Sequence, residues 1–225
     1  MVGRGAINFT DRGHGVTYFF DNDKYVWCNW TPGKYDDNIG WGPTHWDWVA
    51  LIETKFPRVD AILPCPGEVN RGYFFCGDQY ARIQFTPRDG KNQKLLGGVR
   101  PLSEWHSLVK AGFDRVDAAM IVPGTTDQAY FFSRNEFCRV SFKEGSATPD
   151  DLLEGPFLIR ERWPNLGFKT IDTIIPDPSS PNQAYVFSGD KAARIALVVG
   201  GGVDVKTGPM NAAEYWKSLH GAGFY

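Results

Sequence analysis

Apolar and polar positions repeat along this chain in four similar units. An aromatic triplet marks each unit, and the tyrosines that begin these triplets are 55, 57 and 55 residues apart: Tyr18, Tyr73, Tyr130 and Tyr185. A tryptophan with a leucine three positions later keeps the same interval, at Trp48, Trp105, Trp163 and Trp216. Together these marks define a repeat of about 56 residues, a length typical of solenoids, propellers and arrays.

Short alternating runs within a unit predict strands, and the end of the unit predicts a helix. In the second unit, residues 59–63 and 72–76 are apolar, Gly77-Asp78 is a turn pair, and residues 80–85 alternate between two faces. Such runs joined by a tight turn indicate a β-hairpin. Trp105 and Leu108 share a face on a helix. Each unit is therefore expected to hold three or four strands and one short helix, which Pro164 should shorten in the third unit.

This pattern predicts an all-β fold with short helices, a four-bladed β-propeller with one blade per repeat. The blades are expected at about residues 1–57, 58–114, 115–169 and 170–225. A single blade cannot bury both faces of its sheet, whereas a closed ring removes those faces from water at roughly 25 cal/mol per Å² of apolar surface. Residues 1–225 are therefore expected to form one domain.

Composition and charge exclude several classes of partner. The formal net charge is −2, from 24 Lys plus Arg against 26 Asp plus Glu, and no dense basic stretch is present. Nucleic acid is therefore not expected as a partner, because phosphate binding needs clustered positive charge. The sequence has no run of 18 apolar residues, so no membrane span is expected.

The beginning of the chain is polar. The first 20 residues contain Arg4, Asp11, Arg12 and His14 instead of an apolar core, so no secretory signal is visible and a cytoplasmic location is expected. A mature form of a processed protein would look the same. The cysteines lack the spacing of a zinc site and are expected to be free, buried thiols: Cys28, Cys65, Cys76 and Cys138.

The repeated motifs resemble hemopexin repeats. The likeness is carried by an apolar-Asp-Ala opening, by segments such as Gly77-Asp78-Gln79-Tyr80-Ala81-Arg82-Ile83 and Asn22-Asp23-Lys24-Tyr25-Val26, by a Gly-Pro pair and by the Trp-x-x-Leu helix. Over the whole chain the sequence is most similar to the legume seed albumins of this fold. The resemblance implies a single four-bladed domain with a central channel. Animal hemopexin domains join their first and last blades by a disulfide, but the last unit here has no cysteine. Closure is therefore expected to come from packing.

An Asp or Asn lies near the beginning of each unit, and these four residues together are the candidate metal site. These residues are Asn8, Asp60, Asp117 and Asp172, and the resemblance places their strands around the channel. Four-fold repetition would bring four backbone carbonyls around one axis, and hard cations prefer oxygen ligands. The resemblance implies Ca²⁺ or Na⁺, held mainly by these carbonyls. Alternatively, the side chains bind backbone N–H groups of adjacent blades and fix the packing of the blades. Both roles are compatible.

A second repeated position carries arginine in three units: Arg82, Arg139 and Arg194. A repeated arginine favours a structural ion pair over a binding group. Trp27 stands at this position in the first unit, which makes that unit the irregular one.

The first unit also contains every tryptophan outside the repeat pattern: Trp27, Trp30, Trp41 and Trp46. Tryptophan suits sugar stacking, porphyrin packing or a subunit interface. Alternatively, these side chains fill a larger local core and cover the junction between the first and last blades. His14 lies in a predicted loop of the same unit and is a candidate haem ligand, with simple solvent exposure as the alternative.

These observations lead to three functional hypotheses. The first is a non-catalytic propeller that holds a cation in its channel and binds a small ligand such as haem or a polyamine. The alternative is a carbohydrate-binding lectin (haemagglutinin), which needs two sites and therefore predicts a homodimer or several sites per monomer. The third is a storage or protein-docking module. No catalytic triad or zinc-hydrolase motif is apparent, so an enzyme is not expected.

Overall fold

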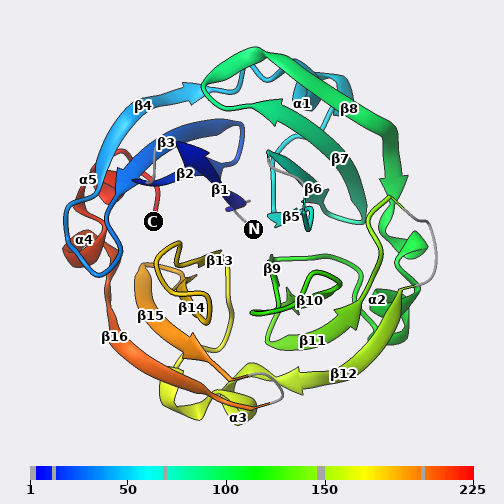
Figure 1. Ribbon diagram of the computed structural model, residues 1–225, viewed down its shortest axis with the longest axis vertical. Coiled ribbons are helices and arrows are strands. Elements are labelled where there is room, and N and C mark those ends of the chain that lie inside the picture. The colour runs from blue at the N-terminus through cyan, green and yellow to red at the C-terminus, as the bar shows by residue number, and fades with distance from the viewer. Residues whose placement is uncertain (1–3, 12–13, 68–69, 146–149, 199–200) are drawn as a thin grey trace.

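The computed structural model describes residues 4–11, 14–67, 70–145, 150–198 and 201–225. It contains four antiparallel sheets of four strands, each in sequence order from the centre outward, arranged in a ring (Figure 1). The first blade consists of β1 (Ala6–Asp11), β2 (His14–Asp21), β3 (Lys24–Trp30) and β4 (Asn38–His45), followed by α1 (Val49–Thr54). The predicted four-bladed β-propeller with few short helices is therefore confirmed.

The other three blades repeat this order. The second has β5 (Ala61–Pro64), β6 (Arg71–Cys76), β7 (Gln79–Thr86), β8 (Asp89–Pro101), η1 (Leu102–Glu104) and α2 (His106–Lys110). The third has β9 (Ala118–Ile121), β10 (Gln128–Ser133), β11 (Glu136–Ser141), β12 (Asp151–Leu158), α3 (Ile159–Arg162) and η2 (Pro164–Leu166). The fourth has β13 (Thr173–Pro176), β14 (Gln183–Ser188), β15 (Lys191–Leu197), β16 (Val203–Asn211), α4 (Ala212–Tyr215) and α5 (Lys217–Gly221).

The innermost strands form the inside of the ring. Figure 1 shows β1, β5, β9 and β13 around the centre, and neighbouring inner strands contact one another all the way round. The ring is closed because β1 contacts β13 as well as β5. The outer strands are largely exposed, so their side chains do not alternate regularly between buried and exposed positions. These strands are β4, β8, β12 and β16. Of the described helices, none has the length and apolar character needed to cross a membrane.

The core lies between blades. Four clusters of buried residues each combine side chains from two consecutive blades, including the junction of the fourth blade with the first. The repeated tryptophans belong to these clusters. The ring centroid of Trp105, for example, lies 5.2 Å from that of Phe131 in the next blade. The ring centroid of Trp216 lies 5.7 Å from that of Phe19 across the closing junction. Burial of large aromatic groups at each junction explains why the repeats need one another.

The repeated tyrosines join the blades by hydrogen bonds. In three blades the tyrosine hydroxyl accepts a backbone N–H from the loop between the third and fourth strands of the following blade. Arg88 donates to Tyr18 at 2.6 Å, Gly145 to Tyr73 at 3.0 Å and Gly33 to Tyr185 at 2.7 Å. We call these the tyrosine contacts. They explain why the first ring of the triplet carries a hydroxyl.

The closing junction has further contacts in place of a disulfide. All four cysteines are free and buried, as expected. Trp30 packs between Tyr185 at 5.0 Å and Trp216 at 5.4 Å. The buried carboxylate of Asp37 accepts the N–H of Leu219 at 2.8 Å, so a loop of the first blade caps α5 of the fourth.

We expect Tyr73→Phe to lower the free energy of unfolding by about 1 kcal/mol, because the Gly145 N–H loses its acceptor while the aromatic packing stays. Denaturant unfolding measures this change. Tyr35→Phe is the control, because Tyr35 is 52% exposed and its ring contact with Tyr215 is retained. Equal unfolding free energies for the two variants would contradict a stabilising role of the tyrosine contact.

Candidate functional site

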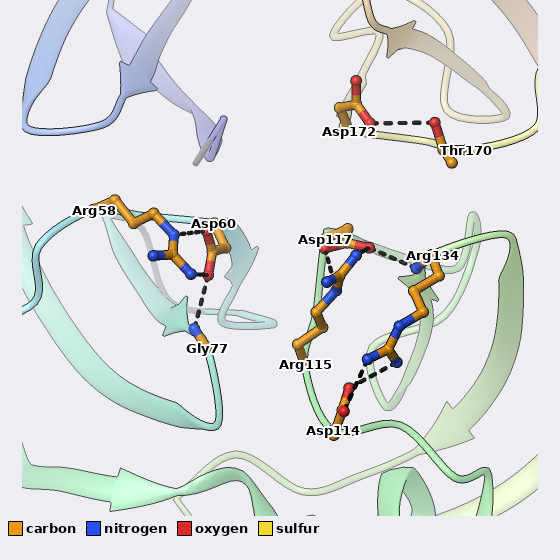
Figure 2. A network of polar contacts seen from close by, with 9 residues as sticks. All are labelled: Arg58, Asp60, Gly77, Asp114, Arg115, Asp117, Arg134, Thr170 and Asp172. Atoms are coloured by element: carbon orange, nitrogen blue, oxygen red, sulfur yellow. Dashed lines mark hydrogen bonds and ion pairs between the residues drawn. The ribbon is translucent and has the colours of Figure 1, made fainter. Parts of the chain in front are cut away.

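Three aspartates lie near the axis of the ring, where the innermost strands begin, and we call this place the channel entrance because the resemblance implies a central channel there. Asp60, Asp117 and Asp172 each precede the innermost strand of their blade, and Figure 2 shows them near the centre of the ring. Each carboxylate accepts the backbone N–H of the hairpin turn between the second and third strands of its own blade: Gly77 at 2.7 Å, Arg134 at 2.5 Å and Gly189 at 2.6 Å. These side chains therefore bind backbone N–H groups, as the structural alternative predicted, but the expectation that the N–H groups belong to adjacent blades is wrong, because each carboxylate holds a turn of its own sheet.

Two of the aspartates also bind an arginine two residues earlier. Arg58 binds Asp60 with both Nε (2.6 Å) and Nη2 (3.3 Å), and the Asp60 side chain is only 4% exposed. Arg115 makes the corresponding contacts with Asp117 at 3.1 and 3.3 Å. The repeated triplet Arg-Val-Asp at 58–60 and 115–117 was the signal in the sequence that could have identified these ion pairs.

The fourth blade obtains its positive charge from the first. Thr170 stands where the other triplets have arginine, and its hydroxyl lies 3.4 Å from Asp172. Arg4 reaches across the closing junction instead. Its Nη1 lies 3.8 Å from Asp172 and donates to the Gly189 carbonyl at 2.7 Å. Its guanidinium lies 4.6 Å above the Tyr225 ring.

The expected alignment of Asn8 with the three aspartates is wrong by four residues. Strand pairing matches Ile62, Ala119 and Ile174 with the second residue of each aromatic triplet, and Ala6 has this partner in the first blade. The residues two positions before these four are Asp60, Asp117, Asp172 and, in the first blade, Arg4. Asn8 lies farther along β1, where it donates to the Pro176 carbonyl at 2.7 Å and accepts from Thr17 at 2.6 Å. The pair Ile7-Asn8 resembles the apolar-Asp motif in sequence, but strand pairing places it four residues after the position of that motif.

The backbone carbonyls at this entrance differ in their hydrogen bonds. The carbonyls of Asp60, Asp117 and Asp172 accept no hydrogen bond from any residue that the structure describes. The equivalent carbonyl of Arg4 accepts the Thr173 hydroxyl. Within the described ranges, no group of three or more His, Cys, Asp or Glu side chains has the arrangement of a metal site.

The tryptophans expected to bind a ligand have different environments. Trp30 is buried at the closing junction, and its indole N–H donates to Thr17 at 2.8 Å. Trp27 is half-buried against Gly40, with the Arg88 guanidinium 4.5 Å above its ring. Trp46 is half-buried and packs near Phe20 at 6.4 Å. These three side chains have structural contacts, in agreement with the alternative weighed for them.

Trp41 differs, because its side chain is 57% exposed. It lies in a shallow groove along β4 with Ile39, Gly42 and Pro43. His14 begins β2, but its side chain is outside the described residues, so its expected role as a haem ligand stays a prediction.

The repeated arginines form ion pairs, as the sequence predicted. Arg139 binds Glu154 at 2.6 Å, and Arg194 binds Asp177 at 2.6 Å. Arg82 has a longer contact, 3.5 Å from Glu144 of the third blade.

Burial raises the pKa of Asp117 above the ordinary value of an aspartate, and the nearby charge of Asp60 adds to this rise, although the Arg134 N–H and Arg115 oppose it. The folded protein therefore binds this proton more tightly than the unfolded chain. The stability that this group contributes is complete below the unfolded pKa and is lost as pH rises through the folded pKa. The Asp117→Asn variant cannot titrate, so its unfolding free energy relative to the parent should increase as pH rises from about 4 to about 7.

Denaturant unfolding across this range measures the difference, and an NMR titration of the Asp117 carboxyl carbon checks its origin. A titration midpoint at or below the ordinary pKa of an aspartate, about 3.9, would contradict the prediction.

No family model matches the chain. Two curated relatives are similar to it over nearly the full length of both chains. Albumin-2 of Lathyrus sativus is 24% identical over 96% of this chain and 96% of its own, and Albumin-2 of Pisum sativum is 24% identical over 98% and 97%.

Solved structures of plant proteins share the fold. The hemopexin fold protein CP4 from cow pea superposes with a TM-score of 0.81 at 25% identity, over 96% of each chain. A plant albumin from Cicer arietinum showing hemagglutination gives 0.82 at 24% identity, over 96% of each chain. A plant lectin with two metal binding sites from Cicer arietinum also gives 0.82 at 24%, over 98% of this chain and 97% of its own. The chain is therefore a four-bladed propeller of the hemopexin fold, similar over almost its whole length to the legume seed albumins.

Proposed function

We propose that this chain is a non-catalytic binding propeller that holds a hard cation, Ca²⁺ or Na⁺, at the entrance of its channel. The observation that carries the proposal is the set of three equivalent carbonyls, of Asp60, Asp117 and Asp172, that accept no hydrogen bond within the described chain. Buried carbonyl groups in folded proteins are nearly always paired, either with protein groups or with water. Three repeated carbonyls without a protein donor can therefore accept a ligand that binds oxygen.

Three carbonyls supply only part of a coordination sphere, because Ca²⁺ takes six to eight oxygen ligands. The remaining positions would be open to a small molecule from the channel side. This arrangement supports a binding protein whose ion and ligand share one entrance. The comparison with a plant lectin described as having two metal binding sites adds support for a cation.

Arg4 stands where the other three blades have an aspartate. It occupies the fourth equivalent position, and its guanidinium repels a cation bound nearby. We expect Arg4→Ala to tighten Ca²⁺ or Na⁺ binding by about tenfold, since removing one positive charge lowers the electrostatic cost by about 1.4 kcal/mol. Calorimetric titration in a buffer free of both ions measures the dissociation constants.

Arg4→Lys is the matched control, because it keeps the charge and should bind the ions as the parent does. An absence of Ca²⁺ and Na⁺ binding in the parent and in both variants would refute the cation site. Spermine and haemin titrations in the same experiment test the two candidate small ligands, since polyamines pair with carboxylates and haem is a planar ligand. Flat responses to both would remove this part of the proposal.

A second candidate function, carbohydrate binding, is favoured by Trp41. Its exposed indole lies along a shallow groove on the outer strand of the first blade, and an exposed aromatic face suits stacking on a sugar ring. The similarity to a plant albumin showing hemagglutination supports this reading. Agglutination needs at least two sites per particle, so the lectin hypothesis includes a homodimer or a second site on the monomer.

We expect Trp41→Ala to abolish agglutination of red cells and binding on a glycan array, while Trp41→Phe retains part of both because an aromatic face remains. Val109→Ala is a control for loss of an exposed apolar side chain, since Val109 is 54% exposed on α2. Light scattering gives the oligomeric state. A parent protein that is monomeric and binds no glycan would exclude the lectin, and storage or docking would remain.

A further inference from the structure

In the second and third blades, the aspartate at the channel entrance is neutralised by an arginine of its own blade. Arg58 binds Asp60 at 2.6 Å, and Arg115 lies 3.1 Å from Asp117. Figure 2 shows both guanidinium groups beside their carboxylates. Each of these two blades therefore adds no net charge to the entrance.

The fourth blade lacks such an arginine. Thr170 stands in its place. The Asp172 side chain is 30% exposed, against 4% for Asp60 and 13% for Asp117. Its positive partner comes from the first blade, because Nη1 of Arg4 lies 3.8 Å from the Asp172 carboxylate. Three carboxylates and three guanidinium groups thus balance at the entrance, and the balance depends on Arg4.

Other charged groups on this side of the ring do not change the balance. Arg134 lies 2.8 Å from Asp114, and both side chains are at least half exposed. Asp21 stands directly across the strands from Lys24. The acids of the hairpin turns, Asp23, Asp78 and Asp190, are exposed, so water and salt screen their charge.

The acceptors that remain for an ion are neutral. The carboxylates of the three aspartates already hold backbone N–H groups of the hairpin turns. Their carbonyls accept no hydrogen bond within the described chain. The fourth equivalent carbonyl, that of Arg4, accepts the Thr173 hydroxyl, which the second and third blades cannot supply because alanine stands there. An ion at this entrance would therefore meet neutral oxygens from three blades.

Neutral oxygens without net charge around them disfavour a divalent ion. The cost of taking an ion out of water rises with the square of its charge in the Born description, whereas its attraction to carbonyl dipoles rises only in proportion to the charge. Ca²⁺ sites in proteins use carboxylates, and the number of charged ligands sets their affinity. Rings of backbone carbonyls, in contrast, are the ligands with which channels bind monovalent cations.

We propose that Arg4 makes the channel entrance selective for a monovalent cation such as Na⁺ over Ca²⁺. This inference rests on the cation site proposed above and narrows its ion to one class. The Arg4 guanidinium neutralises Asp172, and its repulsion of a bound ion doubles when the charge of the ion doubles. The bond from Thr173 removes the fourth carbonyl from the site.

Competition between the two ions tests the parent protein. The sodium NMR linewidth follows Na⁺, and the amide signals of Gly77 and Gly189 report on the entrance, since their N–H groups bind Asp60 and Asp172. Choline chloride holds the ionic strength constant. The response to Na⁺ should saturate, and an equal concentration of CaCl₂ should displace less than half of the bound Na⁺.

Arg4→Asp restores the aspartate of the other blades and removes the positive charge beside Asp172. Its affinity for Ca²⁺ should rise by roughly tenfold or more beyond any rise for Na⁺, because the Coulomb energy is twice as large for the divalent ion. Arg160→Asp is the matched control. It makes the same change of charge on α3 at the outer rim, where the side chain is 68% exposed (Figure 1). The ratio of its two dissociation constants should stay within about twofold of that of the parent.

The thermal unfolding midpoint checks that both variants fold, and the competition in the parent decides the proposal even if Arg4→Asp does not. Tighter binding of Ca²⁺ than of Na⁺ by the parent would overturn the selectivity and leave the cation site in place. Equal gains for both ions in Arg4→Asp would show that Arg4 does not set the selectivity. A parent protein that binds neither ion would refute the cation site itself, and this inference with it.

Discussion

Burial of aromatic side chains between neighbouring blades is the interaction on which the rest of the structure depends. Each blade presents the first and third residues of its aromatic triplet and its helix tryptophan to the next blade, and the middle residue to the previous blade, so every sheet face is covered only when the ring is closed. The closing junction uses the same means, with Trp30 between Tyr185 and Trp216. No covalent link is needed, because the aromatic packing and the Asp37 cap of α5 join the first blade to the last.

Repetition also determines where function can arise. Equivalent positions in four blades share one backbone geometry, so a single substitution changes the chemistry at a fixed place. Arg4 replaces an aspartate and brings positive charge to the channel entrance, where it serves the fourth blade. Trp27 replaces an arginine, and Arg88 of the next blade covers its ring. The carbonyls of the three aspartates belong to the repeat, whereas Arg4 and Trp27 are departures from it.

Prediction from the sequence was most successful for features that repeat. The number of blades, the strands, the short helices and the structural role of Arg139 and Arg194 followed from spacing alone, because four copies average out local ambiguity. The channel entrance was predicted only in part. Asp60, Asp117 and Asp172 were identified, but Asn8 was assigned to their ring because an apolar-Asn pair resembles the motif. Only strand pairing reveals its four-residue displacement.

The sequence by itself determined the repeat, the closed ring and the residues that its junctions bury, since a periodic pattern of apolar side chains has few ways to leave water. It did not determine which of the four additional tryptophans are exposed. Trp30 is buried and Trp41 is on the surface, although both stand in the same blade. Nor did it determine which charged side chains form ion pairs. Arg4 and Asp172, for example, are 168 positions apart in the sequence. Only the tertiary structure decides these, because exposure and ion pairing depend on the neighbours that folding brings from distant parts of the chain.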